Sequence, residues 1–393
     1  MVTPVKLLHM TTVPMTLMFM RGQVDFMRAK GFELALLSSP GSTLDHFAEE
    51  YHLPAYGVPM ERRVTPGRDL LSLVELVRIL RRERPTILHA HTPKAGLLGM
   101  VAAFLARVPV RIYHLRGLPL ATAEGSTRLL LRLAEKTAAL LAHRVLAVSA
   151  SLRRAAAEAG VCRAKKIEVL AGGSGNGVDA HERFNPARFT AEDRLAARRR
   201  WGVPDDAVVI GFVGRLTRDK GLLELATAFR VLAHTNPRLR MVIVGPEEKR
   251  EPVPEKSLES LQRDHRVHFT GMLDDAAVAY LAMDILVLPT YREGFPNVIL
   301  EAGAMELPVV ATAVTGCVDA VVDGVTGRLV PARHAAALTA AIAAYIEQPE
   351  LAREHGKNGR ERVLKDFRQE VIWQELESFY RRMLEARGLE RTA

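Results

Sequence analysis

The chain has 393 residues, about 2.6 times the length of a typical domain, so two packed domains are expected. Apolar residues make up 48% and charged residues 25%, which excludes disordered, collagen-like and coiled-coil proteins. The net charge is +9, and the excess lies in residues 1–178, which hold 24 Lys and Arg against 13 Asp and Glu. That half favours an anionic partner, such as a phosphate-bearing substrate or an anionic membrane surface. Nucleic acid is not expected, because the arginines lie among apolar helical residues and not between aromatic ones.

Short apolar runs alternate with longer amphipathic segments, a pattern typical of βαβ units that form a parallel sheet. In the first half we predict strands at 5–9, 33–37, 55–58, 86–89, 110–113, 145–148 and 166–170. Helical segments are predicted near 15–30, 67–84, 94–106, 127–142 and 149–159. The pattern breaks at 171–177, where four glycines mark a linker.

A second alternating series follows the linker. It predicts strands at 207–213, 241–244, 267–269, 285–288, 309–311 and 328–330. We therefore expect an α/β protein with two Rossmann-like doubly wound domains, 1–178 and 179–366, facing a cleft. The tail is predicted to be strongly helical from Glu350 to Arg387, and its last part, 367–393, is expected to be a helix that packs back toward the first domain. Its apolar stripe is expected to comprise Phe367, Val371, Trp373, Phe379 and Met383.

The loop Gly211-Phe-Val-Gly-Arg-Leu-Thr-Arg-Asp-Lys-Gly221 follows the first strand of the second domain. Glycine lets the backbone approach a phosphate, a helix N-terminus offers free N–H groups, and Arg215 and Lys220 supply positive charge. A diphosphate clamp is one interpretation, and an ordinary solvated loop is the other. The spacing does not match a Walker A loop or a dinucleotide fingerprint.

A second loop runs from Leu288 to Glu301. Pro296 disfavours helical geometry at Phe295, so a helix is predicted to begin at Pro296 or Asn297. Glu293 then lies in the loop and can reach sugar hydroxyls, while Glu301 lies about one turn into the helix and can accept both hydroxyls of a ribose. Solvated surface glutamates remain the alternative.

The segment Leu88-His-Ala-His-Thr-Pro-Lys-Ala-Gly96 follows a strand of the first domain. His89 and His91 share a face of that strand, but no nearby Cys, Asp or Glu completes a metal site, so we expect none. His91 is the better candidate for a polar contact, against the alternative of a histidine satisfied within the core. Lys94 could add to an anion site at the following helix start. Arg116 precedes Gly117 at the end of a later strand.

Four segments together resemble glycosyltransferase family 4 over nearly the whole chain: Gly214-Arg-Leu-x-x-Asp-Lys-Gly221, Glu293-Gly-Phe-Pro-Asn-x-x-x-Glu301, Asn176-Gly-Val-Asp179 and Asp323-Gly-Val-Thr-Gly-Arg-Leu-Val330. The resemblance implies the GT-B fold and a retaining, metal-independent sugar transfer from a nucleotide donor, without a cofactor. It further implies that the C-terminal domain binds most of the donor, which we expect to be a UDP-sugar.

The resemblance assigns roles residue by residue. Arg215 and Lys220 would hold the diphosphate, Glu301 the ribose and Glu293 the transferred sugar, while His91 would face that sugar from the other domain. The base is expected at Gly271, Met272 and Leu273. Further donor contacts are expected at Gly214, Gly294, Phe295, Pro296, Asn297 and Val298.

The first domain is similar to bacterial enzymes that assemble capsule, O-antigen and related surface glycans. The similarity rests on the segments Thr11 to Gln23, His91 to Gly96 and Tyr113 to Pro119. It implies a polyprenyl-diphosphate-linked sugar as acceptor, with Thr12, Lys94 and Arg116 on the acceptor side. Two loops depart from the family pattern: Thr11-Thr-Val-Pro14 replaces Gly-Gly, and Thr315-Gly-Cys-Val-Asp319 stands where Gly-Gly-x-x-Glu is common.

Two alternatives stay open at this point: a UDP-sugar 2-epimerase of the same fold, and a membrane-surface binding protein without catalysis. Cys162 and Cys317 are too few for a disulfide framework, and no apolar run reaches the roughly 18 residues of a membrane span. The start of the chain lacks the pattern of a signal peptide. We therefore expect a cytoplasmic protein, peripheral on the inner face of the membrane.

Overall fold

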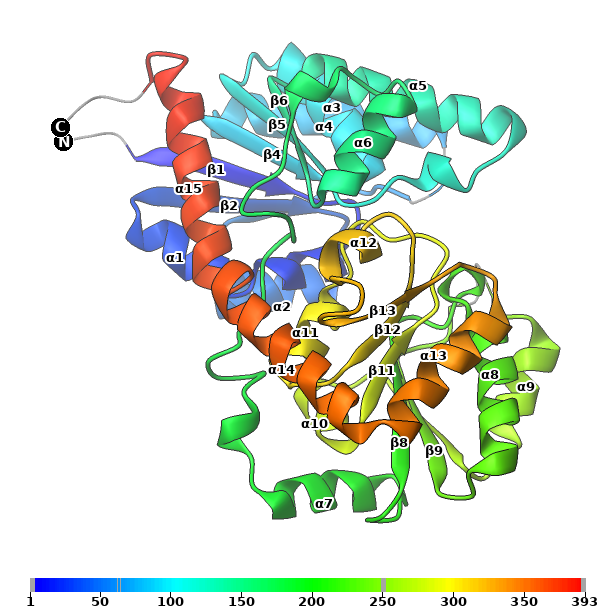
Figure 1. Cartoon of the computed structure of the whole chain (residues 1–393). Coiled ribbons are helices and arrows are strands. Elements are labelled where there is room, and N and C mark those ends of the chain that lie inside the picture. The colour runs from blue at the N-terminus through cyan, green and yellow to red at the C-terminus, as the bar shows by residue number, and fades with distance from the viewer. Residues whose placement is uncertain (1–3, 62, 64, 249–251, 390–393) are drawn as a thin grey trace. The chain divides into compact units, whose positions relative to one another are not determined.

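A computed structural model describes residues 4–61, 63, 65–248 and 252–389 (Figure 1). The chain divides into two compact units. Unit 1 comprises the residues up to Asn176 together with those from Gln369 onward, and unit 2 comprises Gly177–Arg368. Each unit is built on one parallel sheet.

Unit 1 contains a seven-stranded sheet in the order β3-β2-β1-β4-β5-β6-β7. Its strands are β1 (Val5–Met10), β2 (Phe32–Ser38), β3 (Ala55–Gly57), β4 (Ile87–His91), β5 (Val110–Leu115), β6 (Arg144–Ala147) and β7 (Ile167–Glu168). The strand order reverses between β1 and β4, which are paired in register from Leu7 opposite Ile87 to Met10 opposite Ala90. All seven strands lie at the predicted positions, and the central ones are short apolar runs that both faces of the sheet bury.

The helices of unit 1 connect these strands. They are η1 (Pro14–Met20), α1 (Gln23–Ala29), α2 (Ser42–Glu50), α3 (Pro66–Glu83), α4 (Pro93–Leu105), η2 (Pro119–Ala121), α5 (Gly125–Leu141), α6 (Ala150–Glu158), η3 (Ala164–Lys166) and α15 (Gln369–Glu385). The helix predicted over 15–30 is interrupted, because Gly22 has φ +74° and separates η1 from α1. Helix α2 had no counterpart in the prediction.

Helix α15 belongs to unit 1 and lies against α1 (Figure 1, red). It buries Trp373, Phe379 and Tyr380, and the Tyr380 ring lies 5.7 Å from that of Phe32 on β2. The predicted apolar stripe was wrong at Phe367. The helix of the tail breaks after Asp366, so Phe367 lies in the core of unit 2, 5.4 Å from the Phe295 ring.

Unit 2 contains a six-stranded sheet in the order β10-β9-β8-β11-β12-β13. Its strands are β8 (Val208–Val213), β9 (Leu239–Val244), β10 (Val267–Gly271), β11 (Ile285–Leu288), β12 (Val309–Thr312) and β13 (Gly327–Val330). All six match predicted positions, and their side chains form a large apolar core.

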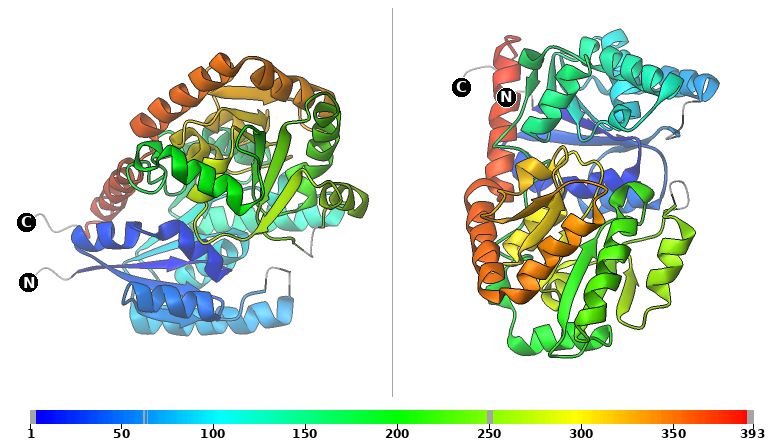
Figure 2. Two further views of the ribbon diagram at one scale, coloured as in Figure 1. Left: turned by 90° about the horizontal axis from the view of Figure 1, so that it is seen from below. Right: turned by 45° about the vertical axis from the view of Figure 1, so that its right-hand side comes forward.

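The helical segments of unit 2 follow in chain order. They are η4 (Pro186–Arg188), α7 (Ala191–Arg200), η5 (Arg218–Lys220), α8 (Leu222–Thr235), α9 (Glu255–Gln262), α10 (Ala277–Ala282), α11 (Asn297–Ala304), α12 (Cys317–Ala320), α13 (Ala335–Glu347) and α14 (Pro349–Asp366). Figure 2 shows α14 (orange) following directly after α13. Among the described helices, none is both long enough and apolar enough to cross a bilayer.

Candidate functional site

The two motif loops of unit 2 follow β8 and β11, the neighbouring strands between which the strand order reverses. In open α/β sheets, ligands bind at this topological switch point, beyond the carboxyl ends of the strands. The sheet therefore brings together two loops that lie about seventy residues apart in the sequence.

The loop after β8 contains both Arg215 and Lys220. The Arg215 side chain is 52% exposed, and its Nη1 lies 3.2 Å from Glu248 Oε2. Gly221 ends the loop with φ +70°, and a Cβ atom there would lie 2.0 Å from the carbonyl oxygen of Pro289. Only glycine allows this approach, which presses the β8 loop against the β11 loop.

Side chains also tie the two loops together. Lys220 Nζ forms an ion pair with Glu293 Oε1, and both side chains are only 15% exposed. Arg292 Nε donates to Asp219 Oδ2 at 2.8 Å, and the Tyr291 N–H donates to the Asp219 carbonyl oxygen at 2.7 Å. The cation predicted for the diphosphate and the carboxylate predicted for the sugar are thus direct neighbours.

Helix α11 begins at Asn297, as predicted, with Pro296 at its N-cap and Glu293 in the loop before it. Tyr280 donates its hydroxyl proton to Glu301 Oε2 at 2.7 Å. Burial raises the pKa of Glu301, and the Tyr280 hydrogen bond opposes that rise. The Tyr280 hydroxyl therefore orients the Glu301 carboxylate through Oε2, and this hydrogen bond does not involve Oε1.

The remaining donor-side residues lie around these loops. Gly294 is in close contact with Gly316, whose Cβ position lies 2.5 Å from the Gly294 carbonyl oxygen. Phe295 and Val298 pack against the core of unit 2. These contacts with the core hold the N-terminus of α11 in place.

The predicted base loop follows β10. Gly271 has φ +67° and accepts a hydrogen bond from the Gly245 N–H at 2.9 Å. A Cβ on Gly245 would lie 2.0 Å from the Gly214 carbonyl oxygen, so the loops after β8, β9 and β10 are in contact. Met272 is 61% exposed, whereas Leu273 packs partly on the core.

The corresponding edge of unit 1 lies beyond β1 and β4. Thr12 Oγ1 lies 2.7 Å from Thr92 Oγ1 and accepts from the Ala95 N–H at 3.0 Å. Thr92 has φ +74°, a strained conformation for a β-branched residue. Lys94 forms a 2.6 Å ion pair with Asp69, so its charge is already compensated.

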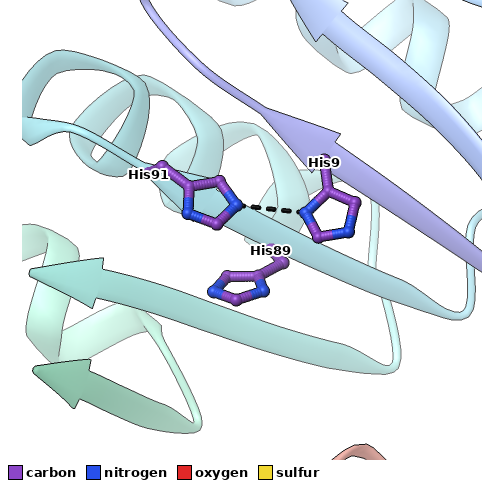
Figure 3. Close-up of side chains that lie close together, drawn as sticks. All are labelled: His9, His89 and His91. Atoms are coloured by element: carbon purple, nitrogen blue, oxygen red, sulfur yellow. Dashed lines mark hydrogen bonds between the residues drawn. The ribbon is translucent and has the colours of Figure 1, made fainter. Parts of the chain in front are cut away.

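Four buried histidines and Arg116 lie together at this edge. Figure 3 shows the rings of His9 and His91 turned toward each other, with His9 Nδ1 3.0 Å from His91 Nε2. Arg116 Nε donates to His91 Nδ1 at 3.2 Å, and His89 Nδ1 lies 2.6 Å from the Tyr380 hydroxyl. The His114 ring stacks on His89 at 5.2 Å.

The Arg116 contact fixes the protonation of this cluster. A guanidinium can only donate, so His91 Nδ1 accepts, His91 Nε2 carries the proton and His9 Nδ1 accepts it. Burial lowers the pKa of all four histidines, with Arg116 adding to the effect, and that of His9 falls to about 3. Burial also lowers the pKa of Arg116 to about 10. The histidines are therefore neutral and Arg116 remains the cation.

His9, His89 and His91 are close enough to bind one metal ion. The sequence offered only His89 and His91, because His9 joins them through the pairing of β1 with β4. A metal on His91 Nε2 would have to displace the proton that Arg116 places there, close to an uncompensated guanidinium. The geometry fits a hydrogen-bonded chain better than a cation site.

Several residues of these sites were not identified from the sequence. Tyr280, Asp219 and Gly245 support the donor loops, while His9 and Tyr380 contact the histidines. The one available signal was position, since His9 and Asp219 both lie near the carboxyl ends of predicted strands.

Two family descriptions match the chain. Residues 193–362 match "Glycosyl transferases group 1", and residues 19–173 match "Glycosyl transferase 4-like domain". A capsular polysaccharide biosynthesis glycosyltransferase of Staphylococcus aureus, CapM, is 35% identical over 96% of this chain and 97% of its own length. A UDP-Gal:alpha-D-GlcNAc-diphosphoundecaprenol alpha-1,3-galactosyltransferase of Escherichia coli is 26% identical over 79% of this chain and 80% of its own.

Solved structures agree on the fold. Anabaena HepE in complex with UDP and glucose has a TM-score of 0.81 at 22% identity, over 96% of this chain and 100% of its own. Sucrose-phosphate synthase of Thermosynechococcus elongatus has a TM-score of 0.79 at 22% identity, over 97% and 100%. The GT-B fold expected from the sequence is confirmed.

Proposed function

The chain belongs to the group 1 glycosyl transferases, as an enzyme of capsular or surface polysaccharide biosynthesis, and from this premise we propose its donor, acceptor and mechanism. The donor is a UDP-sugar, the acceptor is a polyprenyl-diphosphate-linked sugar, and the transfer retains the anomeric configuration without a metal ion. The family assignment favours transfer over the two alternatives, epimerisation and membrane binding without catalysis.

One observation carries the donor proposal: the two loops at the switch point of unit 2 join Lys220 to Glu293, and Arg215 lies in the same loop as Lys220. Two positive groups suit a diphosphate, and a neighbouring carboxylate suits sugar hydroxyls. The Escherichia coli relative is named as a UDP-Gal transferase and the HepE structure contains UDP, and both support the choice of UDP.

The chemistry follows from where charge develops. As the bond between the anomeric carbon and the phosphate oxygen breaks, negative charge grows on the diphosphate beside Arg215 and Lys220. Fixed cations stabilise that charge without having to reorganise. The acceptor oxygen bonds to the same face of the anomeric carbon, and its proton passes to the departing phosphate oxygen. Glu301, oriented by Tyr280, holds the ribose, and the loop with Gly271 and Met272 holds the base.

The acceptor side is proposed at the edge of unit 1 with Thr12 and Arg116. Arg116 has no carboxylate partner among the described residues, so an acceptor diphosphate can compensate its charge. The relative that acts on a diphosphoundecaprenol-linked sugar supports this acceptor class. We further propose that the +11 charge of residues 1–178 holds the enzyme peripherally at the anionic inner face of the cytoplasmic membrane.

The test incubates the full-length protein with UDP- and GDP-sugars and a polyprenyl-diphosphate-linked sugar, with and without EDTA. We expect one UDP-sugar to give a product with the donor's anomeric configuration by NMR, at a rate that EDTA leaves unchanged. Product from GDP-sugars alone would refute the donor. Inversion would refute the mechanism, and loss of activity with EDTA would refute metal independence.

A further inference from the structure

Unit 1 contains a pocket of about 800 Å³ that the proposed reaction does not use. It lies between the end of α5, the start of β6 and the segment that leads into β7. Its apolar wall is formed by Ala139, Leu140, Val161 and Cys162. This pocket is at the amino ends of the strands, whereas His91 and Arg116 lie at the carboxyl ends of β4 and β5. The two sites therefore occupy opposite edges of the sheet.

The rest of the pocket lining is basic: Lys136, His143, Arg144, Arg163, Lys165 and Lys166. No acidic residue lines it. The Lys166 side chain donates to the Leu140 carbonyl oxygen, and the Arg144 side chain donates to that of His143. Glu135, whose charge acts on Cys162 of the lining, is buried and accepts a hydrogen bond from the Tyr113 hydroxyl at 2.7 Å. The pocket thus has positive charge and no built-in counter-ion.

The electrostatic effect is visible at His143. Burial, followed by the charges of Arg111, Arg387, Lys166 and Arg144, lowers the pKa of His143 to about 4. His143 is therefore neutral in the folded protein, and the positive charge of the pocket comes from its lysines and arginines. An incoming anion is the missing partner that this potential favours.

An exposed apolar stripe on α5 continues from the pocket. Leu129, Leu133 and Leu140 are 58%, 53% and 76% exposed. With Lys136 they recur at positions i, i+4, i+7 and i+11, so all four lie on one face of the helix. Lys136 and Leu140 also line the pocket, so the stripe and the pocket form one continuous surface.

We propose that this surface binds an anionic membrane lipid, whose phosphate headgroup enters the basic pocket while the leucines of α5 enter the acyl boundary. A soluble anion would account for the cations but would leave three leucines in water. A nucleic acid is disfavoured because no aromatic residue lines the pocket. Basic residues beside an apolar helix face are the combination that binds anionic bilayers.

This inference deepens the proposed membrane association by naming its site, and it does not depend on the donor sugar. Because the pocket is at the opposite sheet edge from His91, changes in it should leave transfer to a detergent-solubilised acceptor intact. Transfer activity and lipid binding can therefore fail separately.

The test measures sedimentation of the full-length protein with phosphatidylcholine vesicles, with and without 30% phosphatidylglycerol, at 0.15 M NaCl. The pocket variant is Arg163→Gln with Lys165→Gln. The matched control, Arg153→Gln with Arg154→Gln, removes the same charge from exposed positions on α6 that do not line the pocket. Leu133→Glu tests the stripe, and thermal unfolding verifies that each variant folds.

We expect wild type to bind only the vesicles that contain phosphatidylglycerol. The pocket variant and Leu133→Glu should bind at least about tenfold more weakly, and the control within about twofold. Equal losses in the pocket variant and the control would overturn the site in favour of general charge attraction. Full competition by millimolar inorganic phosphate would overturn the lipid, and dimerisation lost in Leu133→Glu would assign the stripe to a second copy.

Discussion

The pair formed by Lys220 and Glu293 allows stability and catalysis to be separated. We consider Lys220→Met, Glu293→Gln and the double variant. Lys220→Met removes a cation from the proposed diphosphate site and also leaves the Glu293 carboxylate, which is only 15% exposed, without its partner. The double variant removes both charges, so no unpaired carboxylate remains.

The structure sets the expected magnitudes. Breaking a buried pair from one side costs about 3–5 kcal/mol, and the residual exposure of this pair reduces the expected loss for Lys220→Met to about 2 kcal/mol of unfolding free energy. The double variant should recover about half of that loss. Its kcat should not recover, because losing one preorganised charge-stabilising group lowers kcat by about 10²–10³-fold.

The assay combines urea unfolding with UDP release in the presence of acceptor. Arg218→Met is the control, because Arg218 is an exposed cation of the same loop, and its kcat should stay within about threefold of wild type. A double variant that regains both stability and kcat would refute the catalytic role of Lys220. A Lys220→Met variant with near wild-type kcat would do the same.

Three further predictions concern single positions. Tyr280→Phe removes the 2.7 Å hydrogen bond to Glu301, so KM for the donor should rise about tenfold with little change in kcat. Because that hydrogen bond lowers the pKa of Glu301, its loss should raise this pKa further. The acid limb of the plot of donor KM against pH should therefore move to higher pH. Gly221→Ala should lower the unfolding free energy by about 3 kcal/mol, against about 1 kcal/mol for Gly31→Ala, which has a similar positive φ but open space around it. His114→Leu should reduce by about 2 kcal/mol the stability that is lost between pH 7 and pH 5.

The sign of the His114 effect follows from its lowered pKa. Burial keeps the imidazole neutral in the folded state, while the unfolded chain binds a proton below about pH 6.5. The stabilising contribution is therefore present above pH 6.5 and lost as the pH falls. Equal pH dependence in wild type and variant, from urea unfolding at both pH values, would contradict it. Unchanged donor KM in Tyr280→Phe, or equal losses in the two glycine variants, would contradict the other two predictions.

The sequence predicted the features that depend on neighbouring residues. Each strand is a short apolar run whose burial on both faces leaves a local pattern. Pro296 restricts the residue before it, and α11 accordingly begins at Asn297. The loop glycines of the motifs could also be recognised, because a positive φ is a property of the single residue that adopts it.

Contacts set by register and packing could not be predicted. His9 reaches His91 only because β1 pairs with β4 in one particular register. Tyr380 lies 291 residues from His89, and nothing local links the two. The broken tail helix was missed because its apolar residues continue through a break that only the packing of Phe367 in unit 2 reveals.

Unit 2 is an insertion in the fold of unit 1, and its two ends adjoin. The Val178 N–H donates to the Phe367 carbonyl oxygen at 2.9 Å, and each of these residues lies one position inside an end of the unit. On the other side, Trp373 Nε1 donates to Asn176 Oδ1 at 2.7 Å. If unit 2 were removed, Asn176 and Gln369 could be joined by a short link, because the chain ends of unit 1 lie close together. An exchange of unit 2 would therefore join the chain at two adjoining points.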